Sequence, residues 1–172
     1  TVTGVRILNE NTGQYTTIPA DAVIFAMGAW SSNLNGTDNI SIPVISGLKV
    51  HSIVVADDDN TTTPDALFLH CQLKNKSLEP EIYPRPDGTV YMCGWADEEA
   101  QPPERADLVE PSSDEAIDTL KQLLNKVVPG MQGAEVLQGQ ACFLPCSKDG
   151  LPVMGVIEGF ENAYVATGHG CW

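Results

Sequence analysis

The sequence predicts a mixed α/β protein, of the α+β kind, whose chain leaves one domain, builds a second and then returns to the first. A continuous apolar run at residues 22–27 is typical of a strand buried on both faces, as in a parallel sheet. The middle of the chain has antiparallel-looking strand patterns and one amphipathic helix. A second short apolar strand follows at residues 162–167. This order indicates two domains.

The N-terminal part of the chain is expected to form a hairpin and then a buried strand. The hairpin comprises strand 2–8, turn 9–13 and strand 14–18. The apolar run 22–27 ends at Gly28, and the small side chains nearby let the backbone approach another group closely. Residues 33–47 form a polar connection that contains proline and glycine.

One helix is clearly marked in the second half of the chain. Ser112 as N-cap and Glu115 three residues later fit a capping box. Apolar side chains then follow helical spacing over residues 116–128, and Pro129 ends the helix. We expect this apolar stripe to be core. The remaining expected strands are residues 48–55, 66–70, 81–85, 89–94, 135–143 and 151–157, with a turn at residues 86–88.

The charge of the chain excludes some classes of partner. Nine basic and 23 acidic residues give a formal net charge of −14. Such a chain repels nucleic-acid backbones and anionic membrane surfaces. No apolar run approaches the roughly 20 residues that a membrane-spanning helix needs. We therefore expect no nucleic-acid partner and no membrane insertion, while the oligomeric state is not set by these features.

The cysteines and histidines predict no metal site. Five cysteines form an odd, scattered set without a CxxC pair, which indicates free thiols in a reducing compartment, most of them as small buried apolar side chains. His51 and His70 are expected to be hydrogen-bonded structural residues. No signal-peptide pattern follows Thr1, so we expect a cytoplasmic protein. The chain stops at Trp172, directly after a glycine-rich turn, so we expect a piece of a longer protein.

Four segments carry a family resemblance when they are taken together and in order. They are residues 20–31, residues 83–88 followed by Gly94, residues 148–155 and residues 162–170. This set resembles the D-amino-acid-oxidase-like group of FAD-dependent oxidoreductases, which includes glycine and sarcosine oxidases. The resemblance covers most of the chain, from about residue 20 to its end.

The resemblance implies an FAD/NAD(P)-binding two-domain oxidoreductase fold. Residues 1–33 would end the FAD-binding domain, residues 34–147 would form the substrate or cap domain with its mixed, largely antiparallel sheet, and residues 148–172 would return to the FAD-binding domain. The GxGxxG motif and the acidic ribose-binding residue are absent and would lie upstream. A final flavin-contacting helix would lie downstream. We therefore expect this piece alone not to hold FAD tightly.

The expected cofactor contacts follow the two strand ends. Gly28 and Gly168 end strands at the edge where open α/β sheets place ligands. The resemblance implies flavin contacts from Gly28, Ala29, Trp30, Gly168, His169, Gly170 and Cys171. The alternatives are that both glycines only make turns, and that His169 only makes structural hydrogen bonds.

Cys142 matches the cysteine that sarcosine-oxidase-like members attach covalently to the flavin. A thiolate there would attack the oxidised ring. The alternative is an apolar cysteine on a core strand.

The substrate positions depart from the family pattern. The resemblance implies two carboxylate-binding arginines, and these positions are Leu144 and Cys171 here. The resemblance also implies a tyrosine that helps to bind the substrate carboxylate, and this position is Glu81 here. Lys49 or Arg85 could substitute. The usual clamp on an amino-acid carboxylate is therefore missing, and no catalytic residue is identified.

Two functions of different classes follow. The first is an FAD-dependent oxidoreductase that oxidises a C–N bond of a small amine or amino-acid-like substrate by hydride transfer. The alternative is a flavoprotein-derived binding or trafficking module without amine oxidase activity, which the lost clamp favours. A third hypothesis is a plain β-rich binding domain without a flavin.

Overall fold

The computed structural model describes residues 1–37, 39–58, 62–73 and 76–171, and it divides the chain into two compact units. Unit 1 comprises Thr1–Gly47 and Leu144–Trp172, and unit 2 comprises Leu48–Phe143. The chain therefore leaves unit 1 once and returns to it once. The chain passes from one unit to the other between residues 47 and 48 and between residues 143 and 144. The expected domain boundaries lay between residues 33 and 34 and between residues 147 and 148. The assignment of an FAD domain and a substrate domain stays a prediction.

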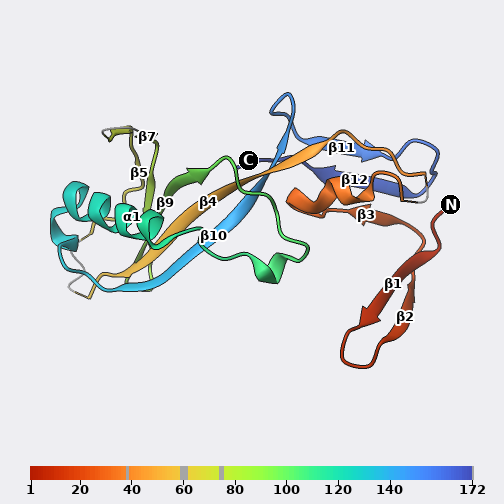
Figure 1. Ribbon diagram of the computed structural model, residues 1–172, viewed down its shortest axis with the longest axis horizontal. Coiled ribbons are helices and arrows are strands. Elements are labelled where there is room, and N and C mark those ends of the chain that lie inside the picture. The colour runs from red at the N-terminus through yellow and green to blue at the C-terminus, as the bar shows by residue number, and fades with distance from the viewer. Residues whose placement is uncertain (38, 59–61, 74–75, 172) are drawn as a thin grey trace. The chain divides into compact units, whose positions relative to one another are not determined.

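Unit 1 contains a hairpin, a three-stranded sheet and a short 3-10 helix (Figure 1). Their bounds are β1 (Gly4–Asn9), β2 (Gln14–Pro19), β3 (Val23–Phe25), η1 (Gly28–Leu34), β11 (Val153–Val156) and β12 (Ala163–Thr167). Strand β12 lies in the centre of the sheet, antiparallel to β11 and parallel to β3. The parallel pair brings the strand ends near Phe25 and Thr167 to the same edge of the sheet.

The core of unit 1 covers only one side of β3. Val23 and Val165 are buried, and the same apolar cluster includes Leu34 and Ile157. Ile24 is 66% exposed because side chains alternate along a strand, so its side chain points to the opposite face. The prediction that this strand is buried on both faces is therefore wrong for the part of the chain that the structure describes.

Unit 2 is built on a five-stranded antiparallel sheet with the order β10-β4-β9-β8-β5. The bounds of its elements are β4 (Ile45–Ala56), β5 (Leu67–Phe68), β6 (Cys71–Gln72), β7 (Ser77–Leu78), β8 (Glu81–Pro84), β9 (Thr89–Asp97), η2 (Ala106–Leu108), α1 (Asp114–Val127), η3 (Pro129–Met131) and β10 (Val136–Ser147). Strands β4 and β10 extend beyond the bounds of unit 2, because they are the two places where the chain passes between the units.

Helix α1 covers one face of this sheet and closes the core of unit 2 (Figure 1). The buried cluster contains Leu120 and Leu124 of the helix with Ile53, Val90 and Met92 of the strands. Burial of each large apolar side chain contributes roughly 1.5–3 kcal/mol relative to exposure. The prediction that the apolar stripe of this helix is core is confirmed.

The start of α1 differs from the expected capping box. Ser113 is the N-cap, and its hydroxyl accepts the backbone N–H of Ala116 at 3.4 Å. With Ser113 in that position, Glu115 is the second helical residue and cannot complete the box. The expectation that Ser112 is the N-cap is wrong because both polar groups of Ser112 have partners outside the helix.

His51 holds the segment before α1 to the sheet. Its side chain is fully buried, with Nδ1 3.0 Å from the carbonyl oxygen of Trp95. Its Nε2 accepts the backbone N–H of Ser112 at 2.9 Å, so the Nδ1 hydrogen is donated to Trp95. The prediction of a structural, hydrogen-bonded histidine is confirmed. His70 is exposed and lies 3.4 Å from the hydroxyl of Ser77.

Gly94, one of the residues that carry the family resemblance, has a structural reason to be glycine. Its φ is 137°, and a Cβ there would meet Cα of Pro80 at 2.5 Å. The register of β4 against β9 shifts between His51 and Ser52, opposite this glycine. Gly94 therefore permits the close approach of two backbone segments.

Among the helices of the described residues, none combines the length and the apolarity required to cross a lipid bilayer.

Candidate functional site

A pair of hydroxyl groups joins η1 to the end of β12 in unit 1. The oxygens Oγ of Ser31 and Oγ1 of Thr167 lie 2.7 Å apart, and both side chains are buried. The carbonyl oxygen of Gly28 lies 2.7 Å from the first and 3.1 Å from the second. The two hydroxyl groups have two hydrogens for these three contacts. One hydroxyl therefore donates to the carbonyl oxygen of Gly28, and the other donates to the oxygen of its partner hydroxyl. The turns at Gly28 and Gly168 are therefore held side by side.

Both of these glycines adopt a left-handed backbone. The φ angle is 56° at Gly28 and 72° at Gly168. A Cβ on Gly28 would find no atom within 4 Å, so the space beside this backbone is open. A Cβ on Gly168 would lie 3.2 Å from Ile45 and 3.4 Å from Ser147. Gly28 thus presents bare backbone to open space, a geometry that lets a flat ligand approach closely.

The segment after Gly168 pairs with the end of β10. Cys146 and His169 form an antiparallel bridge, and the N–H of Gly170 donates to the carbonyl oxygen of Pro145 at 2.7 Å. This register places Leu144 opposite Cys171. The two positions where the family resemblance implies arginines therefore lie next to this bridge, and both carry uncharged side chains.

The structure brings most of the expected cofactor residues together in unit 1. Ala29 is buried and Trp30 half-buried in η1, directly after Gly28. His169 is half-buried and Cys171 is exposed. The remaining residue, Cys142, belongs to unit 2. Contact of any of these residues with a cofactor stays a prediction.

Cys142 lies on β10 with an exposed, free thiol. Partial desolvation nevertheless raises the pKa of this thiol above its ordinary value. None of the five cysteines is fully buried, so the prediction that most are buried apolar side chains is wrong. The cause is their position at strand ends, at turns and on the sheet face opposite α1.

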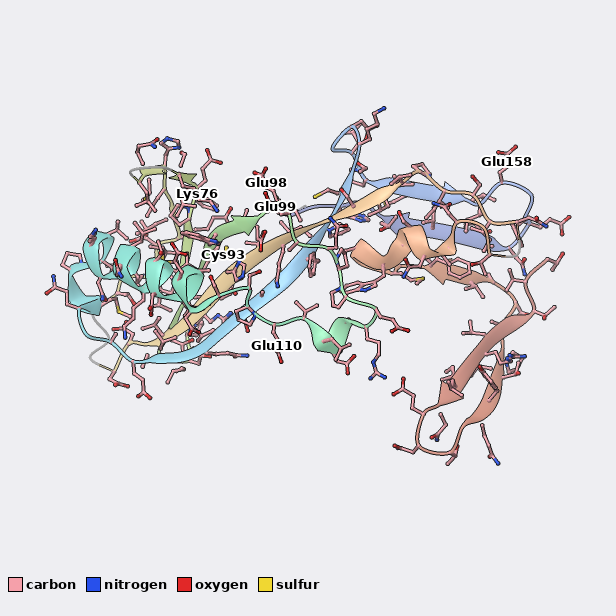
Figure 2. The ribbon with its side chains drawn as sticks, viewed as in Figure 1. Lys76, Cys93, Glu98, Glu99, Glu110 and Glu158 are labelled. Carbon is pink, nitrogen blue, oxygen red and sulfur yellow. The ribbon has the colours of Figure 1, made fainter. Side chains whose placement is uncertain are left out.

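A second cluster of polar and aromatic side chains occupies the face of the unit 2 sheet opposite α1. We call Glu81, Tyr83, Tyr91 and Cys93 the tyrosine face. The register of β8 and β9 pairs Glu81 with Cys93 and Tyr83 with Tyr91. The tyrosine rings lie 6.3 Å apart between centroids, and all four side chains are half-buried. Figure 2 labels Cys93 within the strands of unit 2.

Hydrogen bonding and burial raise the pKa values of the two tyrosines and the cysteine of this face. The hydroxyl of Tyr83 donates to Oε2 of Glu81 at 2.6 Å, and this bond is the main cause that raises the pKa of Tyr83 to about 12. Burial raises the pKa of Tyr91. Burial and the nearby Glu81 carboxylate raise the pKa of Cys93. The tyrosine face thus carries neutral side chains around one carboxylate.

The two cations that could replace a missing arginine lie in different places. The guanidinium of Arg85 stacks 5.0 Å from the ring centroid of Tyr91, at one end of the tyrosine face. The ammonium of Lys49 lies 5.7 Å from the ring centroid of Phe143. Arg85 therefore lies at the tyrosine face, whereas Lys49 lies beside Phe143, the residue after Cys142.

Sequence reasoning singled out Glu81 but missed Tyr83, Tyr91 and Cys93 as neighbours. A usable signal was present, because polar side chains alternate on both sides of the turn at residues 86–88. In a hairpin that alternation places them on one face. The hydroxyl pair of Ser31 and Thr167 had no such signal, because it joins residues 136 positions apart.

The whole chain, residues 1–172, matches the protein-family model described as "DAO: FAD dependent oxidoreductase". The chain is 32% identical over 155 residues to "Putative oxidoreductase TDA3" of Saccharomyces cerevisiae, covering 87% of this chain and 28% of that protein. It is 26% identical over 152 residues to "Glycine oxidase" of Pseudomonas putida, covering 88% of this chain and 37% of that protein.

A solved structure shares the fold. The crystal structure of glycine oxidase from Bacillus cereus superimposes with a TM-score of 0.71 at 19% sequence identity. The match covers 98% of this chain and 41% of that chain. The chain therefore has the architecture of part of such a protein and spans less than half the length of each of these relatives.

Proposed function

Because the chain belongs to the DAO family of FAD-dependent oxidoreductases, we propose that the whole protein oxidises a C–N bond of a small amine or amino-acid-like substrate. The observation that carries this proposal is the convergence of the turns at Gly28 and Gly168. FAD, when bound, accepts a hydride from the carbon beside the substrate nitrogen. The protein supplies position and electrostatics.

The residues of unit 1 fit a flavin at this edge. Gly28 leaves open space beside its backbone, and the strand ends of β3 and β12 are where such sheets bind ligands. Ser31 and Thr167 keep the two turns together without pointing a charge toward the cofactor. In the proposal, the backbone around Gly28 and residues 168–171 contacts the flavin.

The tyrosine face is proposed to bind and orient the substrate. Its two tyrosine rings are half-buried, and the only carboxylate in it, Glu81, accepts a hydrogen bond from the hydroxyl of Tyr83. Arg85 brings a cation to this face through its stacking on Tyr91. Covalent attachment of the flavin at Cys142 stays a prediction from the family resemblance, and the raised pKa of that thiol opposes formation of the thiolate.

The proposal is tested by the absorbance spectrum of the full-length protein and by anaerobic addition of amines and amino acids. We expect a flavin spectrum that at least one such compound bleaches. Colour retained in acid-precipitated protein, and lost in Cys142→Ala, would support covalent attachment. A full-length protein without flavin would contradict the proposal.

A pair of glycine variants separates cofactor contact from backbone strain. Gly28→Ala and Gly13→Ala change residues with similar φ angles, 56° and 68°, and both added Cβ atoms meet open space. Both should therefore lose similar stability. We expect Gly28→Ala alone to weaken FAD affinity, by about tenfold or more in a dialysis assay. Equal retention of FAD by the two variants would remove Gly28 from the cofactor site.

The second candidate function is a flavin-containing binding or trafficking module. The uncharged pair Leu144 and Cys171, at positions where the family pattern has arginines, favours it. Bound flavin that no amine or amino acid bleaches would support this module. The cytoplasmic location and the small-molecule partner stay predictions.

A further inference from the structure

We infer that the tyrosine face recognises a cationic amine through the Glu81 carboxylate and the flanking tyrosine rings, and that it does not require a carboxylate on its ligand. This inference rests on the proposed function, since it names the substrate class of that site. It follows from the charge and the aromatic geometry of the residues on this face of unit 2.

The charge of the face is set by Glu81. Its side chain is half-buried, and within the described ranges no ion pair involves it. The hydroxyl of Tyr83 occupies one lone-pair site of Oε2. A carboxylate offers about four such sites on two oxygens, so its negative charge stays open to a cation, with or without N–H groups on that cation. A partly desolvated carboxylate beside neutral groups attracts a cation more strongly than one in water.

The aromatic rings suit the same ligand. Tyr83 and Tyr91 are tilted by 37° with centroids 6.3 Å apart, and Phe68 meets Tyr83 edge-on at 5.9 Å and 88°. Ring faces attract ammonium and guanidinium groups within about 6 Å of the centroid. Arg85 already makes this contact with Tyr91 at 5.0 Å. The end of the face beside Glu81 and Tyr83 offers the same chemistry to a ligand.

The titratable side chains next to Glu81 are neutral, so Glu81 carries the single negative charge of this face. Tyr83, Tyr91 and Cys93 all have pKa values raised above their ordinary values, so they stay neutral at pH 7. They neither repel an anion nor compete with Glu81 for the cation. The ligand therefore meets one carboxylate in an aromatic surround.

The carboxylate of Glu81 argues against a ligand carboxylate at this end of the face. An anion near Tyr83 would meet the Glu81 carboxylate at close range and be repelled. The guanidinium of Arg85 is already stacked on Tyr91. A simple amine therefore suits the end beside Glu81 better than an α-amino acid does.

The test is calorimetric titration of the full-length, FAD-containing protein with three small probes. Tetramethylammonium is the cation, tert-butanol is a neutral probe of similar shape, and acetate is the anion. We expect tetramethylammonium to bind at least tenfold more tightly than tert-butanol, and acetate not to bind at this face. Binding of acetate that Arg85→Gln abolishes, without binding of tetramethylammonium, would overturn the inference.

Matched variants locate the binding. Glu81→Gln should weaken tetramethylammonium binding about tenfold, whereas Glu79→Gln, the same change at an exposed position two residues earlier, should leave it within twofold. Tyr83→Leu should weaken it and Tyr83→Phe should not, because the phenylalanine keeps the ring. Circular dichroism and thermal melting check that each variant is folded. Unchanged affinity in a folded Glu81→Gln protein would overturn the inference.

The probes also separate this inference from the proposed oxidation. Their binding needs no electron transfer. Glu81-dependent binding of tetramethylammonium, in a protein whose flavin no amine reduces, would refute the oxidase and support the cation site. Flavin reduction by amines without such binding would refute the cation site and leave the oxidase standing.

Discussion

Ser31 and Thr167 lie with their hydroxyl oxygens 2.7 Å apart, although 136 residues separate them in the chain. Both are buried, and both reach the carbonyl oxygen of Gly28. This contact ties η1, which follows β3 in the chain, to the end of the central strand β12. It therefore holds together the two turns that the proposed cofactor site requires.

Removal of one hydroxyl from this pair should destabilise unit 1. Thr167→Val keeps the shape of the side chain but leaves Ser31 with one partner fewer. We expect a loss of about 1–3 kcal/mol in the free energy of unfolding, measured by urea denaturation. Thr16→Val, on an exposed strand position, is the control and should change stability by less than about 0.5 kcal/mol. Equal effects of the two changes would contradict the role of the pair.

Substitution of Gly94 should be much more disruptive than that of an unhindered glycine. In Gly94→Ala the new Cβ would meet the backbone of Pro80, and φ is unfavourable for a side chain. We expect a loss of more than about 2 kcal/mol, since strain at such a position costs about 1–3 kcal/mol before the clash is counted. Gly150→Ala, where a Cβ meets no atom within 4 Å, should lose less in the same thermal melts.

Tyr83 should titrate later than an ordinary tyrosine. Its pKa is raised from 10.0 to about 12, chiefly by the hydrogen bond to Glu81. Since the folded pKa lies above the unfolded one, this group contributes stability below pH 10 that is lost as the pH rises toward 12. Ultraviolet difference titration of the wild type and Tyr83→Phe identifies the transition.

Glu81→Gln provides the matching check on the cause of that shift. The variant removes the charged acceptor, so the Tyr83 transition should move down toward pH 10. A transition that stays near pH 12 in Glu81→Gln would show that the hydrogen bond is not the main cause.

Asp97 should be more acidic than a free aspartate. The hydroxyl of Ser112 donates to its Oδ2 at 2.7 Å, and this bond is the main cause that lowers the pKa of Asp97. Because the folded pKa is depressed, the stability that Asp97 contributes is present above its ordinary pKa and is lost as the pH falls through the folded value. Ser112→Ala should raise the pKa of Asp97, measured by carboxyl NMR titration.

Asp149 is the internal reference for that titration. Its pKa is lowered by the N–H of Leu151 and the hydroxyl of Ser147, which Ser112→Ala does not touch. An equal shift of Asp97 and Asp149 in the variant would indicate a global change instead of loss of one bond.

Local patterns in the sequence were sufficient for features whose causes lie within a few residues. The helical spacing after residue 114 predicted a core helix, and α1 is buried along that stripe. The N-cap was predicted one residue too early because the spacing of Ser112 to Glu115 fits a capping box, although Ser113 is an equally suitable N-cap residue type. The choice between them is made by His51, 61 positions away, which accepts the N–H of Ser112.

The sequence by itself determined the family, the mixed fold, the acidic surface and the turns at Gly28 and Gly168, because each depends on residue type and short-range order. Only the tertiary structure decided which side chains meet. The contact of Ser31 with Thr167, and the bridge between Cys146 and His169, depend on segments brought together from distant parts of the chain. The tyrosine face likewise depends on strand register, since a shift of one residue would turn Tyr83 and Tyr91 to the opposite face of the sheet.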